Sequence, residues 1–250
     1  MRFLRLTIAY EGTRYVGWQI QPNGVSIQLL LEKAWTAVTQ ETLRITASGR
    51  TDSGVHALAQ VCSLCTHSQI AASKLIQALN ANLPFDIRVL NVEEAPGNFH
   101  AIRDAVGKTY RYQIQTGRIQ DLFQRHVRWF VPRNLDIEAM QEATQHIVGK
   151  HDFSSFEATG AAREDSIRTV RELTIQPFQS ERFQFIDIEI SADGFLYNMV
   201  RNIVGSLIVV GRERQGSAWI KTVLDARDRK QAGETAPAHG LFLVHVQYDW

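Results

Sequence analysis

The sequence predicts an α+β fold in which two halves, each combining helices and strands, lie on either side of a cleft. Segments with the alternating pattern of strands are interleaved with segments of helical periodicity along the whole chain. At 250 residues the chain can bury the core of one large domain or of two small ones. Hydrophobic residues make up 44% and charged residues 21%, which is typical of a globular protein and excludes disordered and fibrous classes.

The first half is expected to span residues 1–104. Ser26 is a typical helix N-cap, and Leu30, Leu31 and Ala34 follow it at helical spacing. The segment 11–24 is rich in glycine and polar residues and is expected to be a long loop. The expected strands cover 2–10, 42–47, 55–66 and 87–93, the expected helices cover 27–40 and 73–79 with Ser73 as a cap, and 99–103 would link the halves.

The second half is expected to span residues 105–250 and to repeat the element order of the first half loosely. Tyr110 and Tyr112 alternate with polar residues and share one face of a strand. Residues 123–131 form either an extended or a helical connection, and residues 156–166 are expected to be a mobile loop. The expected strands cover 107–116, 167–177, 183–191 and 241–248, and the expected helices cover 136–148, 195–210 and 218–227.

The formal net charge of +1 predicts no polyanionic partner by itself, but basic residues gather locally. Residues 101–133 hold seven Lys or Arg against two acidic residues, and residues 201–230 hold seven against three. Aromatic residues such as Tyr110, Phe123 and Trp129 are interleaved with the first stretch and could stack on bases. The pattern favours an RNA partner; the alternative for any single cation is an ordinary solvated face.

Cys62 and Cys65 are interpreted as structural residues. A four-ligand zinc site needs a second pair of ligands, and residues three apart on a strand point to opposite faces. The amino-terminal segment is too short and too charged to be a signal peptide. The longest apolar run, 203–210, is far shorter than the ~20 residues that span a bilayer. We therefore expect a soluble cytoplasmic protein with no membrane contact and no metal.

Residues 47–57 place a single carboxylate, Asp52, on a turn edged by Gly49 and Gly54. Glycine permits tight backbone shapes, and Asp followed by Ser can hydrogen-bond its own backbone, so Asp52 is either a turn-forming residue or a displayed reactive group. Arg50 is expected to lie close enough to keep Asp52 ionised. His56 as a metal or acid–base residue and Ser53 as a nucleophile are disfavoured, because no further ligands and no nucleophile elbow surround them.

Residues 49–57, Gly-Arg-Thr-Asp-Ser-Gly-Val-His-Ala, resemble the signature of the tRNA pseudouridine synthase A family. Further matching segments lie in order along nearly the whole chain, at 9–12, 17–19, 80–84, 99–101, 108–112, 149–153, 199–205 and 239–243. The resemblance implies two related domains with mostly antiparallel sheets flanked by helices, a central basic cleft, and a homodimer. It also implies isomerisation of uridine to pseudouridine at positions 38, 39 and 40 of the tRNA anticodon stem-loop, without a cofactor.

The resemblance implies that Asp52 is the catalytic carboxylate. Tyr110 would stack on the target uracil, Arg201 would pair with Asp52, Arg50 would enter the stack left by the flipped base, and Leu241 would contact uracil. Gln115 and the segments 117–130 and 158–164 depart from the family pattern, so the preference among tRNAs is left open. The rival hypotheses are an RNA-binding protein without catalysis and an enzyme that acts on a different RNA.

Overall fold

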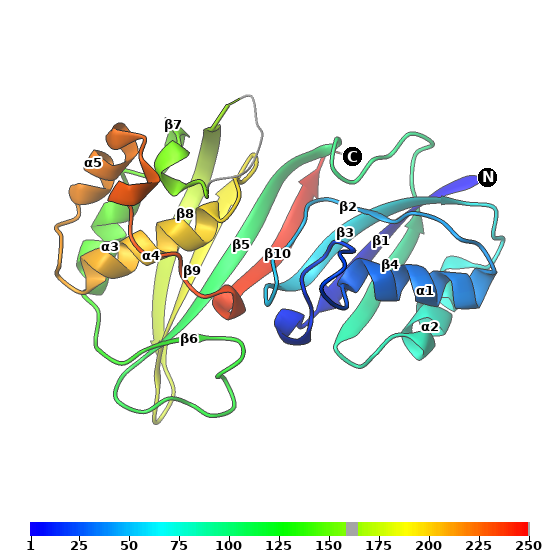
Figure 1. Cartoon of the computed structure of the whole chain (residues 1–250), viewed down its shortest axis with the longest axis horizontal. Coiled ribbons are helices and arrows are strands. Elements are labelled where there is room, and N and C mark those ends of the chain that lie inside the picture. The colour runs from blue at the N-terminus through cyan, green and yellow to red at the C-terminus, as the bar shows by residue number, and fades with distance from the viewer. Residues whose placement is uncertain (159–164, 250) are drawn as a thin grey trace. The chain divides into compact units, whose positions relative to one another are not determined.

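The computed structural model describes residues 1–158 and 165–249, and its elements are labelled in Figure 1. The chain divides into two compact units, which are described separately. Unit 1 comprises Met1–Val106 and Phe242–Trp250, and unit 2 comprises Gly107–Leu241. Among the described residues, no helix is long and apolar enough to cross a membrane.

Unit 1 is built on a sheet with the strand order β4-β1-β3-β10, and the short strand β2 (Thr46–Ala47) also pairs with β3. β1 (Arg2–Tyr10) runs antiparallel to both β3 (His56–Thr66) and β4 (Ile87–Glu94), whereas β10 (Leu241–Tyr248) is parallel to β3. Alternate β1 residues Leu4, Leu6 and Ile8 are fully buried, as period-2 patterning requires. Helices α1 (Ile27–Thr39) and α2 (Ala72–Asn82) pack against each other, and α2 packs on β4.

Unit 2 contains the antiparallel series β5-β9-β8-β7, and β6 (Trp129–Val131) is parallel to β5. The strands are β5 (Ala105–Thr116), β7 (Gly149–Asp152), β8 (Ile167–Gln179) and β9 (Gln184–Ala192). The helices are α3 (Ile137–Thr144), α4 (Met199–Gly211) and α5 (Trp219–Ala226). Helix α3 packs on α4 and β8, and α4 is buried on almost every side. The predicted α+β class with mostly antiparallel sheets is therefore confirmed.

Several predicted boundaries in unit 1 are wrong, for tertiary reasons. Only Thr46–Ala47 of the predicted strand 42–47 pairs as a strand. The backbone of Ile45 is instead bonded by α1 side chains, since its N–H donates to Glu32 and its carbonyl accepts from Gln28. Helix α2 begins without a side-chain cap and continues to Asn82. It passes through Asn80, whose amide side chain both donates to and accepts from the Val89 backbone.

In unit 2 the predicted helices are too long. Helix α4 begins at Met199 rather than residue 195, because its N-cap Asn198 adopts a left-handed conformation with φ of 59°. Helix α3 ends at Thr144 rather than residue 148, and Val148 is 39% exposed. The undecided connection 123–131 ends in β6 and contains turns before it. The predicted mobile loop 156–166 lies largely outside the described residues.

The division into 1–104 and 105–250 stays a prediction about domains. The compact units follow it closely near residue 106, but they differ at the carboxyl end, where Phe242–Trp250 packs in unit 1. The reason is the pairing of Phe242 and Leu243 with the first residues of β3. The chain therefore crosses between the units twice.

Candidate active site

Asp52 lies on the loop that connects β2 to β3 and is half-buried. The Val55 N–H donates to the Asp52 carbonyl at 3.1 Å, which closes a tight turn, and Gly54 in that turn has φ of 79°. A side chain is strained in this conformation, so glycine is needed there. The loop thus presents Asp52 on a turn, as the sequence predicts.

The Asp52 turn is clamped from one side by the end of β1 and the segment 11–24. The Trp18 N–H donates to the Thr51 carbonyl at 3.0 Å, and the hydroxyls of Tyr10 and Thr51 share a hydrogen bond of 2.8 Å. Gly17 has φ of 99°, and a Cβ there would lie 2.5 Å from the Thr51 carbonyl oxygen. This contact fixes the residue directly before Asp52.

Three further hydrogen bonds hold the other parts of the loop. The Ser48 hydroxyl donates to the side-chain oxygen of Gln60 at 2.6 Å, and the Gln60 amide donates to the Gly49 carbonyl at 2.9 Å. The Ser53 hydroxyl donates to the Tyr15 carbonyl at 3.0 Å. Ser53 is therefore engaged in holding the loop, in agreement with its low rank as a nucleophile. Because backbone and side chains are fixed on both sides, the loop can hold a reactive carboxylate in one geometry.

His56 supports the segment that holds the Asp52 loop. Its side chain is 1% exposed, its Nδ1 accepts from the Gly12 N–H at 3.0 Å, and its ring stacks on Phe242 at 4.5 Å. An accepting Nδ1 places the ring proton of neutral His56 on Nε2. Within residues 1–158 and 165–249 no group of three His, Cys, Asp or Glu is arranged to hold a metal ion.

A buried ionic group braces the same segment. Asp86 is 8% exposed, accepts from the Tyr15 hydroxyl at 2.5 Å, and pairs with Arg14 at 3.0 Å. Burial, together with the Asp86 carboxylate, raises the pKa of Tyr15 to about 12. Sequence reasoning missed these supports because Tyr15 and Asp86 are far apart in the chain and no local pattern marks them as a pair.

Arg50 lies two residues before Asp52, and its expected effect on the ionisation of Asp52 stays a prediction. Its side chain is exposed, and in the described part of the chain it makes no salt bridge. Arg50 and Asp52 lie on the same loop, but their spacing alone does not bring a solvated guanidinium onto a carboxylate. Asp52 has other interactions within the structure.

Tyr110 and Tyr112 lie on one face of β5 but differ in their surroundings. The Tyr110 ring is 9% exposed and meets the ring of Phe195 edge-on at 5.1 Å. Tyr112 is fully buried, and its hydroxyl donates to the Pro237 carbonyl at 2.7 Å. Tyr112 is thus a core residue of unit 2.

Arg201 lies in the first turn of α4 and is half-buried. Its Nε donates to the Ala236 carbonyl at 2.7 Å, and one terminal nitrogen donates to the Asn198 side chain at 2.8 Å. Arg201 and Tyr112 therefore bond to successive carbonyls, those of Ala236 and Pro237. Leu241, 6% exposed, follows a few residues later at the start of β10.

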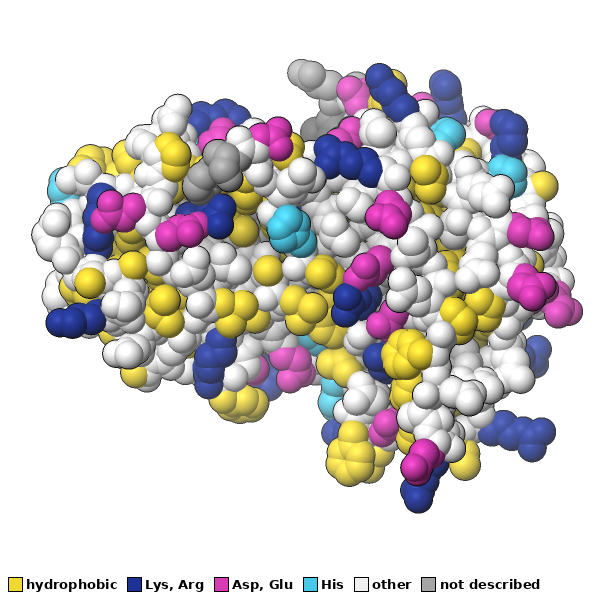
Figure 2. Space-filling view, turned by 180° about the vertical axis from the view of Figure 1, so that it is seen from behind, with side chains coloured by type: hydrophobic (Ala, Val, Ile, Leu, Met, Phe, Trp, Pro, Cys, Tyr) yellow, Lys and Arg dark blue, Asp and Glu magenta, His cyan; other side chains and the backbone are white. Residues whose placement is uncertain are grey.

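The two basic stretches are only partly available to an RNA partner. Arg111 pairs with Glu189 at 2.5 Å, and Arg128 is 9% exposed, stacked over Phe185 and paired with Asp187. The remaining exposed cations include Arg118, Arg125 and Lys230. On the face drawn in Figure 2, basic and acidic side chains lie interspersed. Several of these cations are therefore paired within the chain rather than free to bind RNA.

Both cysteines are free, and burial raises the pKa of Cys62. Cys62 is buried and Cys65 is half-buried on β3. This agrees with their interpretation as structural residues.

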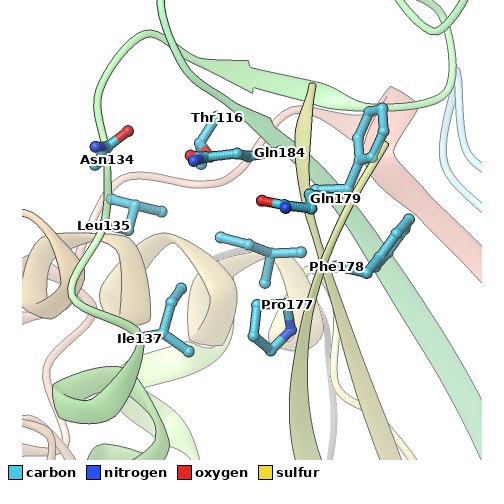
Figure 3. A pocket seen from close by; sticks show the side chains of 10 residues that line it. Thr116, Asn134, Leu135, Ile137, Pro177, Phe178, Gln179 and Gln184 are labelled. Atoms are coloured by element: carbon cyan, nitrogen blue, oxygen red, sulfur yellow. The ribbon is translucent and has the colours of Figure 1, made fainter. Parts of the chain in front are cut away.

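A hollow of about 380 Å³ in unit 2 contains none of the predicted site residues. Figure 3 shows its apolar floor of Leu135, Ile137 and Pro177, with amide side chains such as Gln184 above it. In unit 1 a hollow of about 320 Å³ is lined by Tyr10, His56 and Asp86, which support the Asp52 loop, among other residues. Neither hollow by itself identifies the site.

The predicted site residues are divided between the units. Arg50 and Asp52 belong to unit 1, whereas Tyr110, Arg201 and Leu241 belong to unit 2. Within unit 1 the Asp52 carboxylate lies on a loop that hydrogen bonds hold on both sides. Within unit 2 it supplies a nearly buried aromatic ring and a guanidinium held by two acceptors.

Comparisons with known proteins agree with the motifs. The sequence model of the tRNA pseudouridine synthase family matches residues 6–103 and 143–249. A protein of Clostridium perfringens (strain 13 / Type A) called tRNA pseudouridine synthase A 2 is 44% identical over 248 residues, covering 99% of this chain and 100% of the relative. The tRNA pseudouridine synthase A of Exiguobacterium sp. (strain ATCC BAA-1283 / AT1b) is 43% identical over 250 residues. This match covers 100% of this chain and 99% of the relative.

A third relative, the tRNA pseudouridine synthase A of Thermoanaerobacter sp. (strain X514), is 42% identical over 248 residues, covering 99% of this chain and 100% of the relative. Arg50, Asp52, Arg201 and Leu241 fall in the ranges that the family model matches, whereas Tyr110 falls between them. The resemblance drawn from the motifs is confirmed at nearly full length: the chain belongs to the tRNA pseudouridine synthase family.

Proposed function

We propose that this chain isomerises uridine to pseudouridine in the anticodon stem-loop of tRNA, at positions 38, 39 and 40. The observation that carries the proposal is the clamped loop of residues 49–57, which holds one carboxylate, Asp52, within the motif typical of the family. Family membership supports the reaction, and the resemblance of the motifs supports the choice of positions.

The reaction breaks the bond between uracil N1 and ribose C1′, turns the base, and joins C5 to C1′. The proton on C5 is lost to solvent and N1 gains one, so atoms balance and neither oxidant nor reductant is required. We assign the catalytic role to Asp52, because a carboxylate can act as a nucleophile or a base. Attack on C1′, addition to C6 and elimination of the base are all compatible with one carboxylate.

The other roles belong to binding and orientation. Tyr110 is proposed to stack on the flipped uracil, since an aromatic ring edge-packed by Phe195 is a rigid platform. Arg201 is proposed to supply the positive charge that favours the ionised form of the catalytic carboxylate. Leu241 is assigned to apolar contact with uracil. Arg50, whose side chain is exposed, is assigned to the position that the base vacates.

We further propose that the chain acts in the cytoplasm as a homodimer and needs no cofactor. Family resemblance supports the dimer, and a tRNA substrate supports the compartment. The central basic cleft predicted from the sequence belongs to the same proposal. The exposed cations of the two basic stretches, such as Arg118 and Arg125, would contribute phosphate contacts.

The test is the release of tritium from tRNA transcripts that carry uridine labelled at C5. Matched transcripts replace uridine by cytidine at 38, 39 or 40, one position at a time. We expect the amount of tritium released to fall in proportion to the number of target uridines that have been replaced. Release that is unchanged when all three are replaced would assign the enzyme to other uridines, and tRNA binding without any release would favour the RNA-binding protein.

A further inference from the structure

Residues 228–237, called the strap below, lie against helix α4. The two backbones approach so closely that a Cβ on Gly205 would overlap the Glu234 carbonyl, and a Cβ on Gly233 would lie 2.7 Å from the Gly205 carbonyl oxygen. The Gly233 N–H donates to the buried hydroxyl of Ser206 at 2.9 Å. The strap is thus seated directly on the helix backbone.

Arg229 ties this strap together from within. Its terminal nitrogens donate to the Gly233 carbonyl at 2.9 Å, to the Thr235 hydroxyl at 2.9 Å and to the side-chain oxygen of Asn202 at 3.0 Å. The Thr235 hydroxyl donates to the same Asn202 oxygen at 2.7 Å, and the Asn202 amide nitrogen donates to the Phe156 carbonyl at 2.7 Å. One planar guanidinium therefore joins Gly233 and Thr235 of the strap to Asn202 of α4.

Burial of Arg229 shows that it is not an ordinary surface cation. The side chain is half-buried, and this desolvation lowers the pKa of its guanidinium. Its donors are directed at internal acceptors in a fork that only arginine provides. The assignment of Arg229 to an RNA-facing basic stretch is therefore disfavoured.

The far end of the strap holds Arg201. The Ala236 carbonyl accepts from Arg201 Nε at 2.7 Å, and the Ala236 N–H donates to the Arg201 carbonyl at 3.1 Å. Ala236 follows Thr235 directly, so the residue bonded by Arg229 lies next to the residue that bonds Arg201. A shift of the strap along α4 would change the position of the acceptor that aims this guanidinium.

We infer that Arg229 is a positioning residue for Arg201: through Asn202 and Thr235 it fixes the strap so that the Ala236 carbonyl holds the Arg201 guanidinium in one orientation. The inference rests on the role proposed above for Arg201 in the isomerisation. Arg229 itself touches neither substrate nor reacting atoms in this account. Its removal leaves the oxygens of Asn202 and Gly233 without one of their donors, which loosens the strap.

A spectroscopic measurement tests the positioning without relying on activity. The Arg201 Nε–H is observed in a proton–nitrogen correlation spectrum and assigned by its absence in Arg201→Lys. In Arg229→Met we expect this signal to broaden or exchange faster with water. The matched control is Glu234→Gln, which removes the ion pair between Glu234 of the strap and Arg212 at the end of α4 and should leave the signal unchanged. An unchanged signal in Arg229→Met would overturn the inference.

A kinetic measurement tests whether the orientation of Arg201 matters for the reaction. With enzyme in excess over labelled tRNA, Arg229→Met should lower the rate constant of tritium release about tenfold to a hundredfold, since a displacement near 1 Å can have that effect. The tRNA dissociation constant should stay within about twofold, because phosphate contacts dominate binding. Arg229→Lys should not restore the rate, because an ammonium cannot reach three acceptors in a fork.

A double-mutant comparison separates positioning from general damage. In the Arg201→Lys background, Arg229→Met should cause little further loss of rate, because both changes act through one guanidinium. Fully additive losses, or a weakened tRNA affinity that Arg229→Lys restores, would overturn the inference while leaving the isomerase intact. If Arg229→Met does not fold, Thr235→Val removes the two hydrogen bonds of the Thr235 hydroxyl but keeps the bonds from Arg229 to Gly233 and Asn202, and it should give a smaller change in the same direction. Absence of release from the unaltered chain would instead count against the proposed function.

Discussion

Replacement of Gly17 by alanine tests whether the clamp on the Asp52 loop matters for catalysis. The new Cβ would lie 2.5 Å from the Thr51 carbonyl oxygen, whereas ordinary contact begins at 3.4 Å, so the backbone must separate by 3.4 − 2.5 = 0.9 Å. The φ of 99° adds left-handed strain. Together, strain and overpacking should lower the free energy of unfolding by about 2–5 kcal/mol. The displacement of Thr51 should lower the single-turnover rate of tritium release by about tenfold to a hundredfold.

The control is Gly97→Ala in the same unit, where a Cβ would have nothing within 4 Å. Urea unfolding should show a change within about 0.5 kcal/mol for this variant, with an unchanged rate. Both assays are run on protein that remains folded, at a temperature well below the transition of Gly17→Ala. A folded Gly17→Ala protein with the full rate would refute the reasoning that the clamp positions Asp52.

Three tyrosine replacements give further predictions. Tyr110→Phe should retain tRNA binding and stacking, and a loss of tritium release in it would assign a proton-transfer role to the hydroxyl. Tyr112→Phe should lose about 1–3 kcal/mol in urea unfolding, because the Pro237 carbonyl loses its donor. The pKa of Tyr15 is raised to about 12 in the folded chain, whereas its ordinary value of 10.0 applies in the unfolded chain. Between these values the unfolded chain loses the proton more readily, so the free energy of unfolding should fall as pH rises from 10 towards 12. This fall should be smaller in Tyr15→Phe, and an identical pH dependence in both proteins would contradict the bond between Tyr15 and Asp86.

Elements with a strong local pattern could be predicted from the sequence. Strand β1 at Arg2–Tyr10 and strand β10 at Leu241–Tyr248 have the predicted bounds. Ser26 caps α1 as expected, since its side chain accepts from the Leu29 N–H. These features depend on the two-residue period and on side chains a few positions apart, which the sequence displays directly.

Features set by distant residues could not be predicted in this way. The course of the chain at Ile45 is decided by Glu32 and Gln28 on a helix, and the start of α4 by the left-handed Asn198. The Asp52 loop was recognisable from its glycines, but the clamp by Tyr10 and Gly17 joins segments more than thirty residues apart. No periodicity or spacing signals such contacts.

The same limit applies to charge. Arg229 counts toward a basic stretch in the sequence, yet its donors are directed at Asn202, Gly233 and Thr235. Arg50 is two residues from Asp52 but remains exposed and forms no salt bridge in the described part of the chain. Sequence proximity of opposite charges is therefore a weak predictor of an ion pair, because solvation competes with a single exposed contact.

The measurement that tests the central claim most directly is tritium release from C5-labelled uridine in unmodified tRNA, with the unaltered chain and Asp52→Asn compared side by side. Asparagine keeps the size of the side chain but removes its negative charge. We expect release by the unaltered chain alone, with similar tRNA affinity in both. Equal release by the two proteins would contradict the assignment of Asp52, and release by neither, with both bound to tRNA, would contradict the isomerase itself.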